Sequence, residues 1–295
     1  MTVHEKLSAL REIMKKENLD AYIVSGTDPH NSEYLPAAWK QREWISGFTG
    51  SFGTVVVLKE DAGLWTDTRY FIQAEKQLSG TGIRLHKLRV PDAVDYPDWL
   101  ATVLPENGRV GLDYFCTSVS GMKELQAKLA PKGIQLVDKN ELIGDLWIDR
   151  PALPEGKLFT VPAEVAGKSV EEKIRMVQDV LREKNADYFL FSALDEIAWL
   201  FNIRCNDIEY NPVAISYAVV GKERSWLFVK RSKVTREVAE HLGYANVEIR
   251  DYHHLFLFLD ETGKGARFCV DVNSLNFAVY HKITSLSAVT ETVSP

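Results

Sequence analysis

The chain has 295 residues, 45% of them hydrophobic and 26% charged, and a formal net charge of −6. This length fits one large domain or two ordinary ones, and the composition is typical of a soluble globular protein. The acidic balance offers no basic stripe for nucleic acid, and the lack of an 18-residue apolar run argues against a transmembrane helix.

The cysteines and the start of the chain indicate the cellular compartment of the protein. Three cysteines lie far apart, at Cys116, Cys205 and Cys269, and buried reduced thiols are the simplest interpretation of an odd, widely spaced set. Residues 1–5 lack the basic segment and apolar core of a secretion signal. We therefore expect a cytoplasmic protein.

The first predicted element is an amphipathic helix that begins after Thr2. Thr2 and Glu5 have the spacing of a capping box, and apolar residues follow at positions 3, 7, 10 and 14. Ser169 and Glu172 repeat this pattern at a shift of 167 residues. The match continues through residue 28 of the first copy and Asp195 of the second. Helix and strand recurring at a constant shift indicate a duplicated α/β unit.

The remaining elements follow in chain order, with a linker over residues 149–157, where two prolines and a glycine interrupt the pattern. We expect two similar α/β domains over residues 1–154 and 155–295, each a mixed sheet flanked by helices. The predicted strands are Ala21–Val24, Thr54–Leu58, Ala62–Trp65, Arg109–Leu112, Ile134–Val137, Tyr188–Phe191, Ala214–Val220, Ser225–Val229 and Arg267–Val272. The predicted helices are Thr68–Leu78, Ser118–Leu129, Glu196–Phe201, Thr235–Leu242, His253–Leu259 and Phe277–Ser285.

Most residues that could be metal ligands, nucleophiles or acid/base groups are better explained by structural roles. The seven histidines have no metal-ligand spacing, so we assign no metal site, and the adjacent His253 and His254 suit a surface. The glycines of residues 47–53 precede a strand rather than a helix, so they suggest a shaped loop and not a phosphate loop. No nucleophile elbow occurs. Asp195 and Glu196 could act as paired carboxylates, but capping of the following helix is the simpler role, also for Asp28.

The segment Trp65–Phe71 is less easily explained. A strand ends and a helix is predicted to begin here, which makes Asp67 a candidate N-cap. Arg69 then falls in the first helical turn, where a cation is unfavourable with the helix dipole. A structural salt bridge and a contact with a ligand carboxylate or carbonyl are both open for Arg69.

Four segments together resemble the long, three-domain form of Xaa-Pro aminopeptidase, also called aminopeptidase P. They are Trp44–Gly53, Trp65–Phe71, Leu194–Asn202 and Asp207–Val213. The resemblance spans essentially the whole chain but covers only the first two domains of that family. It implies two creatinase/prolidase N-terminal-type domains with a ribonuclease-H-like fold, and it agrees with the duplication.

The resemblance implies an accessory role for this chain. In that family a third domain of pita-bread fold binds two Mn²⁺ ions through two Asp, one His and two Glu, and cleaves the bond before a penultimate proline. Nothing here matches that domain, so no catalytic residue, metal ligand or cofactor is assigned, and the chain alone is expected to be inactive. The family's arginine of the Trp-Thr-Asp-x-Arg-Tyr string corresponds to Arg69, which implies substrate binding.

The partners implied are proline-containing peptides and the chain's own C-terminal catalytic domain, with no nucleic acid and no membrane. The alternative is a peptidase-like protein-interaction module without catalysis, because fold alone does not determine function. The oligomeric state, the metal identity and the preferred residue before proline do not follow from the sequence.

Overall fold

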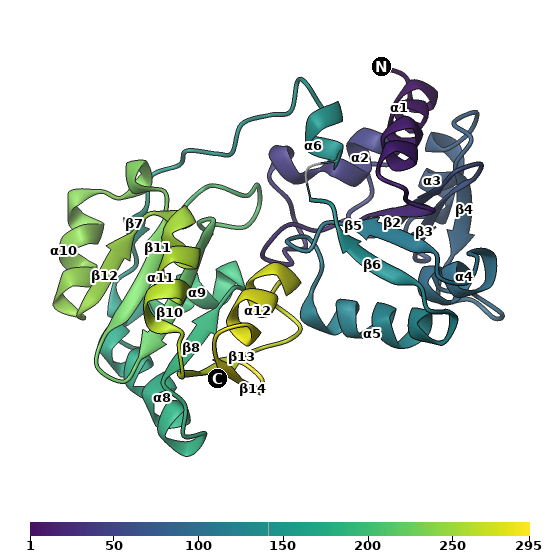
Figure 1. Cartoon of the computed structure of the whole chain (residues 1–295). Coiled ribbons are helices and arrows are strands. Elements are labelled where there is room, and N and C mark those ends of the chain that lie inside the picture. Colours follow the sequence, from purple (N-terminus) through teal and green to yellow (C-terminus); the bar gives the residue numbers. More distant parts are fainter. Residues whose placement is uncertain (141) are drawn as a thin grey trace. The chain divides into compact units, whose positions relative to one another are not determined.

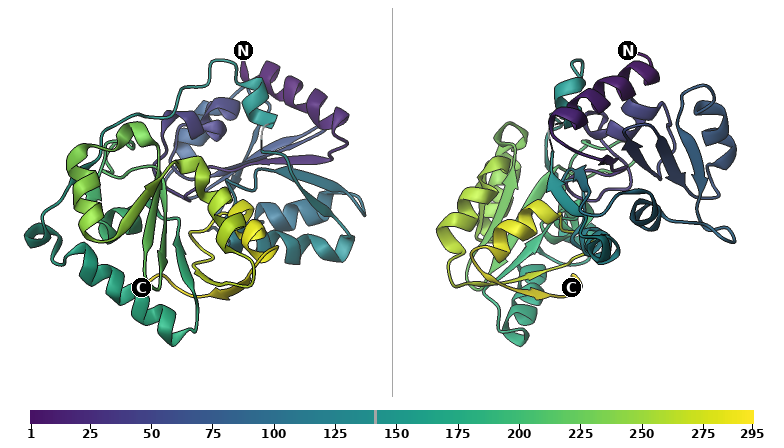
Figure 2. Two further views of the ribbon diagram at one scale, coloured as in Figure 1. Left: turned by 60° about the vertical axis from the view of Figure 1, so that its left-hand side comes forward. Right: turned by 45° about the vertical axis from the view of Figure 1, so that its right-hand side comes forward.

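The structure is a computed structural model that describes residues 1–140 and 142–295. The chain divides into two compact units, which we call the first and the second domain. The first consists of Met1–Asp28 and Ala37–Ala152, and the second of Pro29–Pro36 and Leu153–Pro295. Each is an α/β domain with helices on both faces of a mixed sheet, as the sequence predicted (Figures 1 and 2).

The first domain is built on a six-stranded sheet with the order β4-β3-β2-β1-β5-β6. Strand β2 is antiparallel to β1 and β3, and the other pairs are parallel. The strands are β1 Ala21–Val24, β2 Thr54–Leu58, β3 Ala62–Thr66, β4 Arg84–Lys87, β5 Arg109–Leu112 and β6 Gln135–Asp138. The helices are α1 Val3–Lys16, η1 Ala37–Trp39, α2 Gln41–Ser46, α3 Phe71–Gln77, α4 Tyr96–Val103, α5 Val119–Leu129, η2 Ala130–Lys132 and α6 Leu142–Leu146.

The second domain repeats this sheet, with the order β12-β11-β10-β8-β13-β14 and the same pattern of parallel and antiparallel pairs. A two-stranded sheet, β7-β9, is added. The strands are β7 Phe159–Thr160, β8 Tyr188–Phe191, β9 Ile203–Arg204, β10 Ser216–Gly221, β11 Ser225–Val229, β12 Val247–Arg250, β13 Arg267–Val270 and β14 Ala288–Glu291. The helices are α7 Ala163–Ala166, α8 Val170–Glu183, α9 Leu194–Leu200, η3 Arg231–Lys233, α10 Arg236–Tyr244, η4 Tyr252–His254, α11 Leu255–Thr262 and α12 Phe277–Thr284.

Each core lies between its sheet and one 14-residue helix, α1 in the first domain and α8 in the second. Helix α1 buries Leu7, Leu10 and Met14 against alternate residues of β1, and helix α8 does the same in the second domain. Successive side chains of a strand point to opposite faces, so both faces of these central strands are covered by helices. This explains why β1 and β8 have almost continuous apolar sequences.

The duplication predicted from the sequence is present at the level of single contacts. Helices α1 and α8 both begin with a complete capping box, on Thr2 and on Ser169. A carboxylate just before each central strand accepts the backbone N–H at the start of its parallel neighbour. Asp20 accepts from Arg109 at 2.9 Å, and Asp187 accepts from Arg267 at the same distance. These repeated contacts fix the register of the sheet in both copies.

Candidate functional site

The loop Gly47–Gly53 precedes β2, as predicted, and it is held by a buried arginine. The guanidinium of Arg42 donates hydrogen bonds to the carbonyl oxygens of Gly50, Ser51 and Gly53. Burial lowers the pKa of Arg42 to about 10, and the group stays protonated at neutral pH. A side chain at Gly26 would clash with both Gly53 O and the Arg42 guanidinium. The loop is therefore a rigid platform for the residues that project from it.

The turn that follows β3 departs from the sequence prediction. Helix α3 begins at Phe71 rather than Thr68, and its N-cap is Tyr70. The Asp67 carboxylate instead accepts the backbone N–H of Arg69 at 3.1 Å, and Tyr70 N donates to Asp67 O at 3.0 Å. The Asp67 hydrogen bonds thus close a turn rather than cap a helix. The prediction that Asp67 is the helix N-cap was wrong, and Arg69 lies before the helix.

Asp67 also binds the Arg69 side chain in a two-point interaction. Arg69 Nε and Nη2 donate to the two carboxylate oxygens, at 3.0 and 2.9 Å. Hydrogen bonds from the Arg69 side chain hold the pKa of Asp67 below its usual value. The Asp67 side chain is 1% exposed, whereas that of Arg69 is 53% exposed. A buried carboxylate thus orients an arginine that still faces solvent. The structural salt bridge is confirmed, and the contact with a ligand stays a prediction.

Aromatic rings border this arginine. The Arg69 guanidinium carbon lies 5.2 Å from the centre of the Tyr70 ring and 5.9 Å from that of Phe52. Tyr70 Oη is 2.7 Å from Ser51 Oγ, which ties the turn to the rigid loop. Phe48 is fully buried and supports Tyr70 edge-on, but Phe52 is 39% exposed. Phe48 therefore packs under the loop, whereas Phe52 is partly exposed.

A second arginine at this place was missed by sequence reasoning. Arg89 lies two residues beyond the end of β4, and its Nη1 is 3.8 Å from the Asp67 Oδ2. Its guanidinium carbon is 5.7 Å from the centre of the Phe52 ring. Twenty-two residues separate it from Asp67, so no local pattern could have linked the two.

In the second domain, the capping role predicted for Asp195 was wrong. Helix α9 begins at Leu194 with Ala193 as its N-cap, so Asp195 and Glu196 lie inside the first turn. They line a cavity of about 470 Å³ that also includes Asp271. Burial, together with Asp195 and Asp271, raises the pKa of Glu196 to about 7. The structure thus gives this carboxyl a perturbed environment that the sequence did not indicate.

The segment Pro29–Pro36 contributes to the same cavity. His30 is 2% exposed, with Nδ1 2.9 Å from Ser192 O and Nε2 3.0 Å from Tyr252 Oη. These contacts anchor the segment in the second domain. Asp28, just before it, is buried and precedes no helix, so the capping predicted for this residue also fails.

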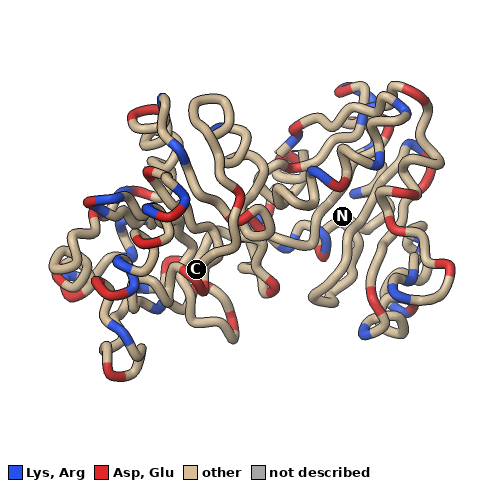
Figure 3. Tube along the Cα trace, turned by 90° about the horizontal axis from the view of Figure 1, so that it is seen from below, with Lys and Arg blue, Asp and Glu red and all other residues tan. Residues whose placement is uncertain are grey.

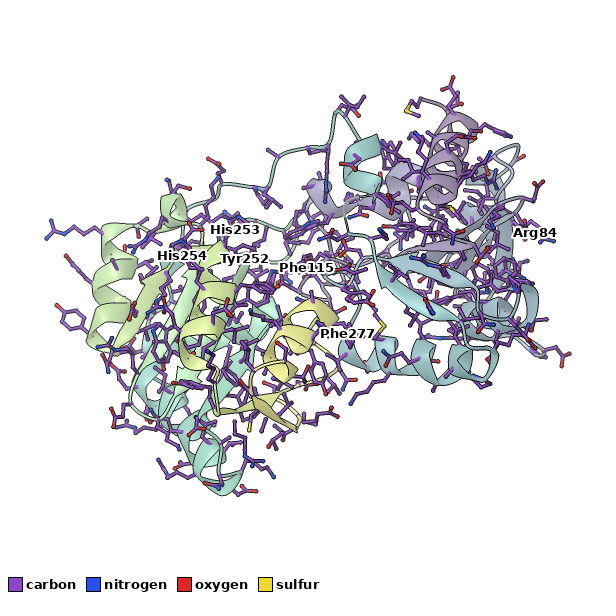
Figure 4. All side chains as sticks on the ribbon, in the orientation of Figure 1. Arg84, Phe115, Tyr252, His253, His254 and Phe277 are labelled. Atoms are coloured by element: carbon purple, nitrogen blue, oxygen red, sulfur yellow. The ribbon has the colours of Figure 1, made fainter. Side chains whose placement is uncertain are left out.

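The other candidates have structural surroundings. All three cysteines are buried and free of disulfides, as predicted. His253 and His254 are exposed, as expected, in the short helix η4 before α11 (Figure 4). Among residues 1–140 and 142–295, no three His, Cys, Asp or Glu side chains form a group that could hold a metal ion. No helix of the described part is long and apolar enough to cross a membrane. Acidic and basic residues are interspersed along the chain in each domain (Figure 3).

The sequence matches the family "Creatinase/Prolidase N-terminal domain" twice, over residues 6–146 and 149–295. "Aminopeptidase P2" of Arabidopsis thaliana is 38% identical over 95% of this chain, and "Probable Xaa-Pro aminopeptidase P" of Coprinopsis cinerea is 38% identical over 99% of it. The chain covers 40% and 46% of those two proteins, which is less than half of their lengths.

The X-prolyl aminopeptidase from Caenorhabditis elegans has a similar structure over 99% of this chain and 50% of its own. The TM-score is 0.92 at 30% identity, and that protein is described as a cytosolic enzyme with a di-nuclear active site. The two family matches together cover nearly all of the chain. The chain therefore belongs to the creatinase/prolidase N-terminal domain family, as two consecutive domains that correspond to the N-terminal region of Xaa-Pro aminopeptidases.

Proposed function

We propose that the whole protein is a Xaa-Pro aminopeptidase of the cytoplasm, and that this chain shapes substrate access to its catalytic part. Relatives named for this activity match almost the full chain. The substrate would be a peptide with proline in second place. Residues 1–154 would form the first accessory domain and residues 155–295 the second.

The proposed metal centre lies in the part of the relatives that this chain does not cover. Two Mn²⁺ ions would supply an activated water for attack on the scissile carbonyl. The described residues contain no cluster of three metal-ligating side chains, so they do not fit this role. What the chain contributes is binding and orientation of the peptide next to its own catalytic domain.

Arg69 is the substrate-binding residue of the proposal. The observation that carries it is the two-point interaction with the buried Asp67, which fixes the direction of an exposed guanidinium. An arginine held in this way loses little side-chain entropy when it binds a peptide carbonyl or carboxylate. Its planar fork of donors suits both groups.

The test uses the full-length protein that contains this chain. Arg69→Ala and Arg69→Lys should lower kcat/KM for a Xaa-Pro tripeptide about tenfold or more, since a charge-assisted hydrogen bond contributes roughly 1.5–3 kcal/mol. Metal content should stay unchanged. Arg84→Ala, which removes an exposed arginine from the start of β4, is the matched control (Figure 4).

Two results would contradict the proposal. Unchanged kinetics in both Arg69 variants would return this residue to a structural role. Turnover of Xaa-Pro peptides by the 295-residue chain alone would contradict an accessory function. A thermal unfolding scan of each variant shows whether the substitution also destabilises the fold. Arg69→Lys keeps a positive charge beside the Asp67 carboxylate, so loss of activity without loss of stability in this variant indicates a binding defect.

A further inference from the structure

Two arginines share one buried carboxylate on the surface of the first domain. Asp67 is fully engaged by Arg69, while Arg89 stands 3.8 Å from it, which is beyond hydrogen-bond distance. The Arg89 side chain is 72% exposed. Two guanidinium groups face one carboxylate, so this group of three side chains has one positive charge in excess.

The backbone of Arg89 has a conformation that Gly, Asn or Asp adopts more easily than arginine does. Its φ is +58°, in the left-handed region where side chains other than Gly, Asn and Asp are uncommon. Such a conformation costs free energy in the folded state. Residues kept in it cluster at functional sites, because the surrounding structure has to hold them there. Arg89 is therefore a candidate for a functional role.

Phe52 completes the arrangement. Both guanidinium carbons lie within 6 Å of its ring centre, at 5.9 Å for Arg69 and 5.7 Å for Arg89. A ring face attracts a cation and limits its motion. Phe52 itself projects from the loop that Arg42 fixes, and its carbonyl accepts a hydrogen bond from Thr66 Oγ1 at 2.6 Å. The two arginines are thus oriented around a rigid, half-exposed ring.

We propose that Arg89, next to Arg69 and Phe52, forms a carboxylate-binding site for the peptide substrate. The identity of the ligand rests on the proposed function, because the anionic groups of a peptide are its C-terminal carboxylate and its acidic side chains. An arginine fork binds a carboxylate through two parallel N–H···O bonds. The site favours peptides that carry a free carboxylate over the corresponding amides.

The first experiment measures binding and does not depend on catalysis. The 295-residue chain is titrated with three peptides while the arginine Nε–Hε signals are followed by NMR. The peptides are Ala-Pro-Ala with a free carboxylate, Ala-Pro-Ala amide and Ala-Pro-Glu amide. We expect the free acid to shift the Arg89 signal and the Ala-Pro-Ala amide not to shift it. A response to the glutamate peptide would identify a side-chain carboxylate as an accepted source.

Substitutions then separate charge from structure. Arg89→Ala and Arg89→Gly should weaken binding of the free acid about three- to tenfold, the range expected for a partly exposed charged pair. Glycine also relieves the positive φ, so Arg89→Gly should unfold no earlier than the parent chain. Arg89→Lys keeps the charge without the fork and should bind with intermediate affinity.

Arg84→Ala serves as the control, because Arg84 is an exposed arginine at the other end of β4, paired with Asp61. Strand β4 therefore separates it from Arg89, which lies beyond Lys87. This substitution should change neither the affinity for the free acid nor the discrimination against the amide.

The same variants in the full-length protein give a kinetic test. Arg89→Ala should raise KM for the free acid with little change in kcat, and leave the amide unaffected. Equal binding of acid and amide by the parent chain, or discrimination that survives Arg89→Gly, would overturn the inference. If the full-length protein cleaves no Xaa-Pro peptide, the proposed function fails, while the titration still decides whether Arg89 binds a carboxylate.

Discussion

The second domain contains an ion pair that is almost completely buried, between Lys233 of η3 and Asp207. The two side chains are 2% and 0% exposed. Asp207 Oδ2 also accepts the backbone N–H of Ile215 at 2.9 Å, and Oδ1 accepts from Cys205 Sγ at 3.3 Å. The carboxylate thus connects a loop, a strand entrance and a short helix.

We predict that Asp207→Asn destabilises the second domain by about 3–5 kcal/mol. The substitution preserves the shape of the side chain but leaves the Lys233 ammonium buried without an anion, and that cost exceeds the value of the pair itself. Lys233→Met should cost less, about 2–3 kcal/mol, because two hydrogen-bond donors still satisfy the carboxylate. The double variant removes both charges and should lie within about 1 kcal/mol of the parent chain.

The assay is a double-mutant cycle in urea. Because the chain has two domains, a single transition cannot be assumed, and amide hydrogen exchange in β10 and β11 reports on the second domain alone. The expected coupling energy between the two positions is about 4–9 kcal/mol, far above the 0.3–0.5 kcal/mol scatter of independent sites. A cost below about 1 kcal/mol for Asp207→Asn, or additive effects in the double variant, would refute this account of the pair.

Two further predictions concern helix capping and pH. Ser169→Ala should lower the stability of the second domain by about 1 kcal/mol, and Thr2→Ala should do the same in the first, since each removes one half of a capping box; urea titration checks both. Glu196 keeps its proton up to pH about 7 in the folded chain, against 4.5 for its ordinary value. Stability therefore falls as pH rises between these values, and Glu196→Gln should abolish that fall. The partly exposed side chain limits the effect to about 1 kcal/mol, which unfolding curves at pH 4.5 and 8 would resolve.

Sequence reasoning located the elements whose signals are local and strong. The capping boxes set the starts of α1 and α8, and continuous apolar runs set the bounds of β1 and β8. Three strands at sheet edges, β4, β12 and β14, were missed. Their residues are mostly half-exposed or exposed, and their sequences contain charged side chains. An edge strand is stabilised by the neighbour it pairs with, and its own residues carry little of that information.

The candidate site was predicted only in part. Arg69 could be singled out because its string is specific, but the start of the following helix was wrong by three residues. The error arose because an Asp before a helix and an Asp in a turn look alike in sequence. Arg89 gave no signal at all, since its relation to Asp67 depends on the parallel pairing of β3 with β4.

Comparison of the two copies separates framework from function. In each domain a lysine of the equivalent helix, α1 or α8, donates to the carbonyl of a tryptophan, Lys6 to Trp44 at 2.6 Å and Lys173 to Trp199 at 2.8 Å. A contact that occurs in both copies serves what the copies share, which is the fold.

The arginine site, by contrast, occurs in one copy. The registers of the two hairpins align residue 67 of the first domain with Lys230 of the second, and residue 69 with Ser232. The second copy therefore has a positive charge, on Lys230, where the first has the Asp67 carboxylate. It has no guanidinium at Ser232, where the first has Arg69. The β3–α3 turn is therefore free to differ without loss of the fold, since the second domain keeps the same sheet with neither side chain. This difference between the copies supports the proposal that Asp67 and Arg69 serve binding of a ligand in the first domain.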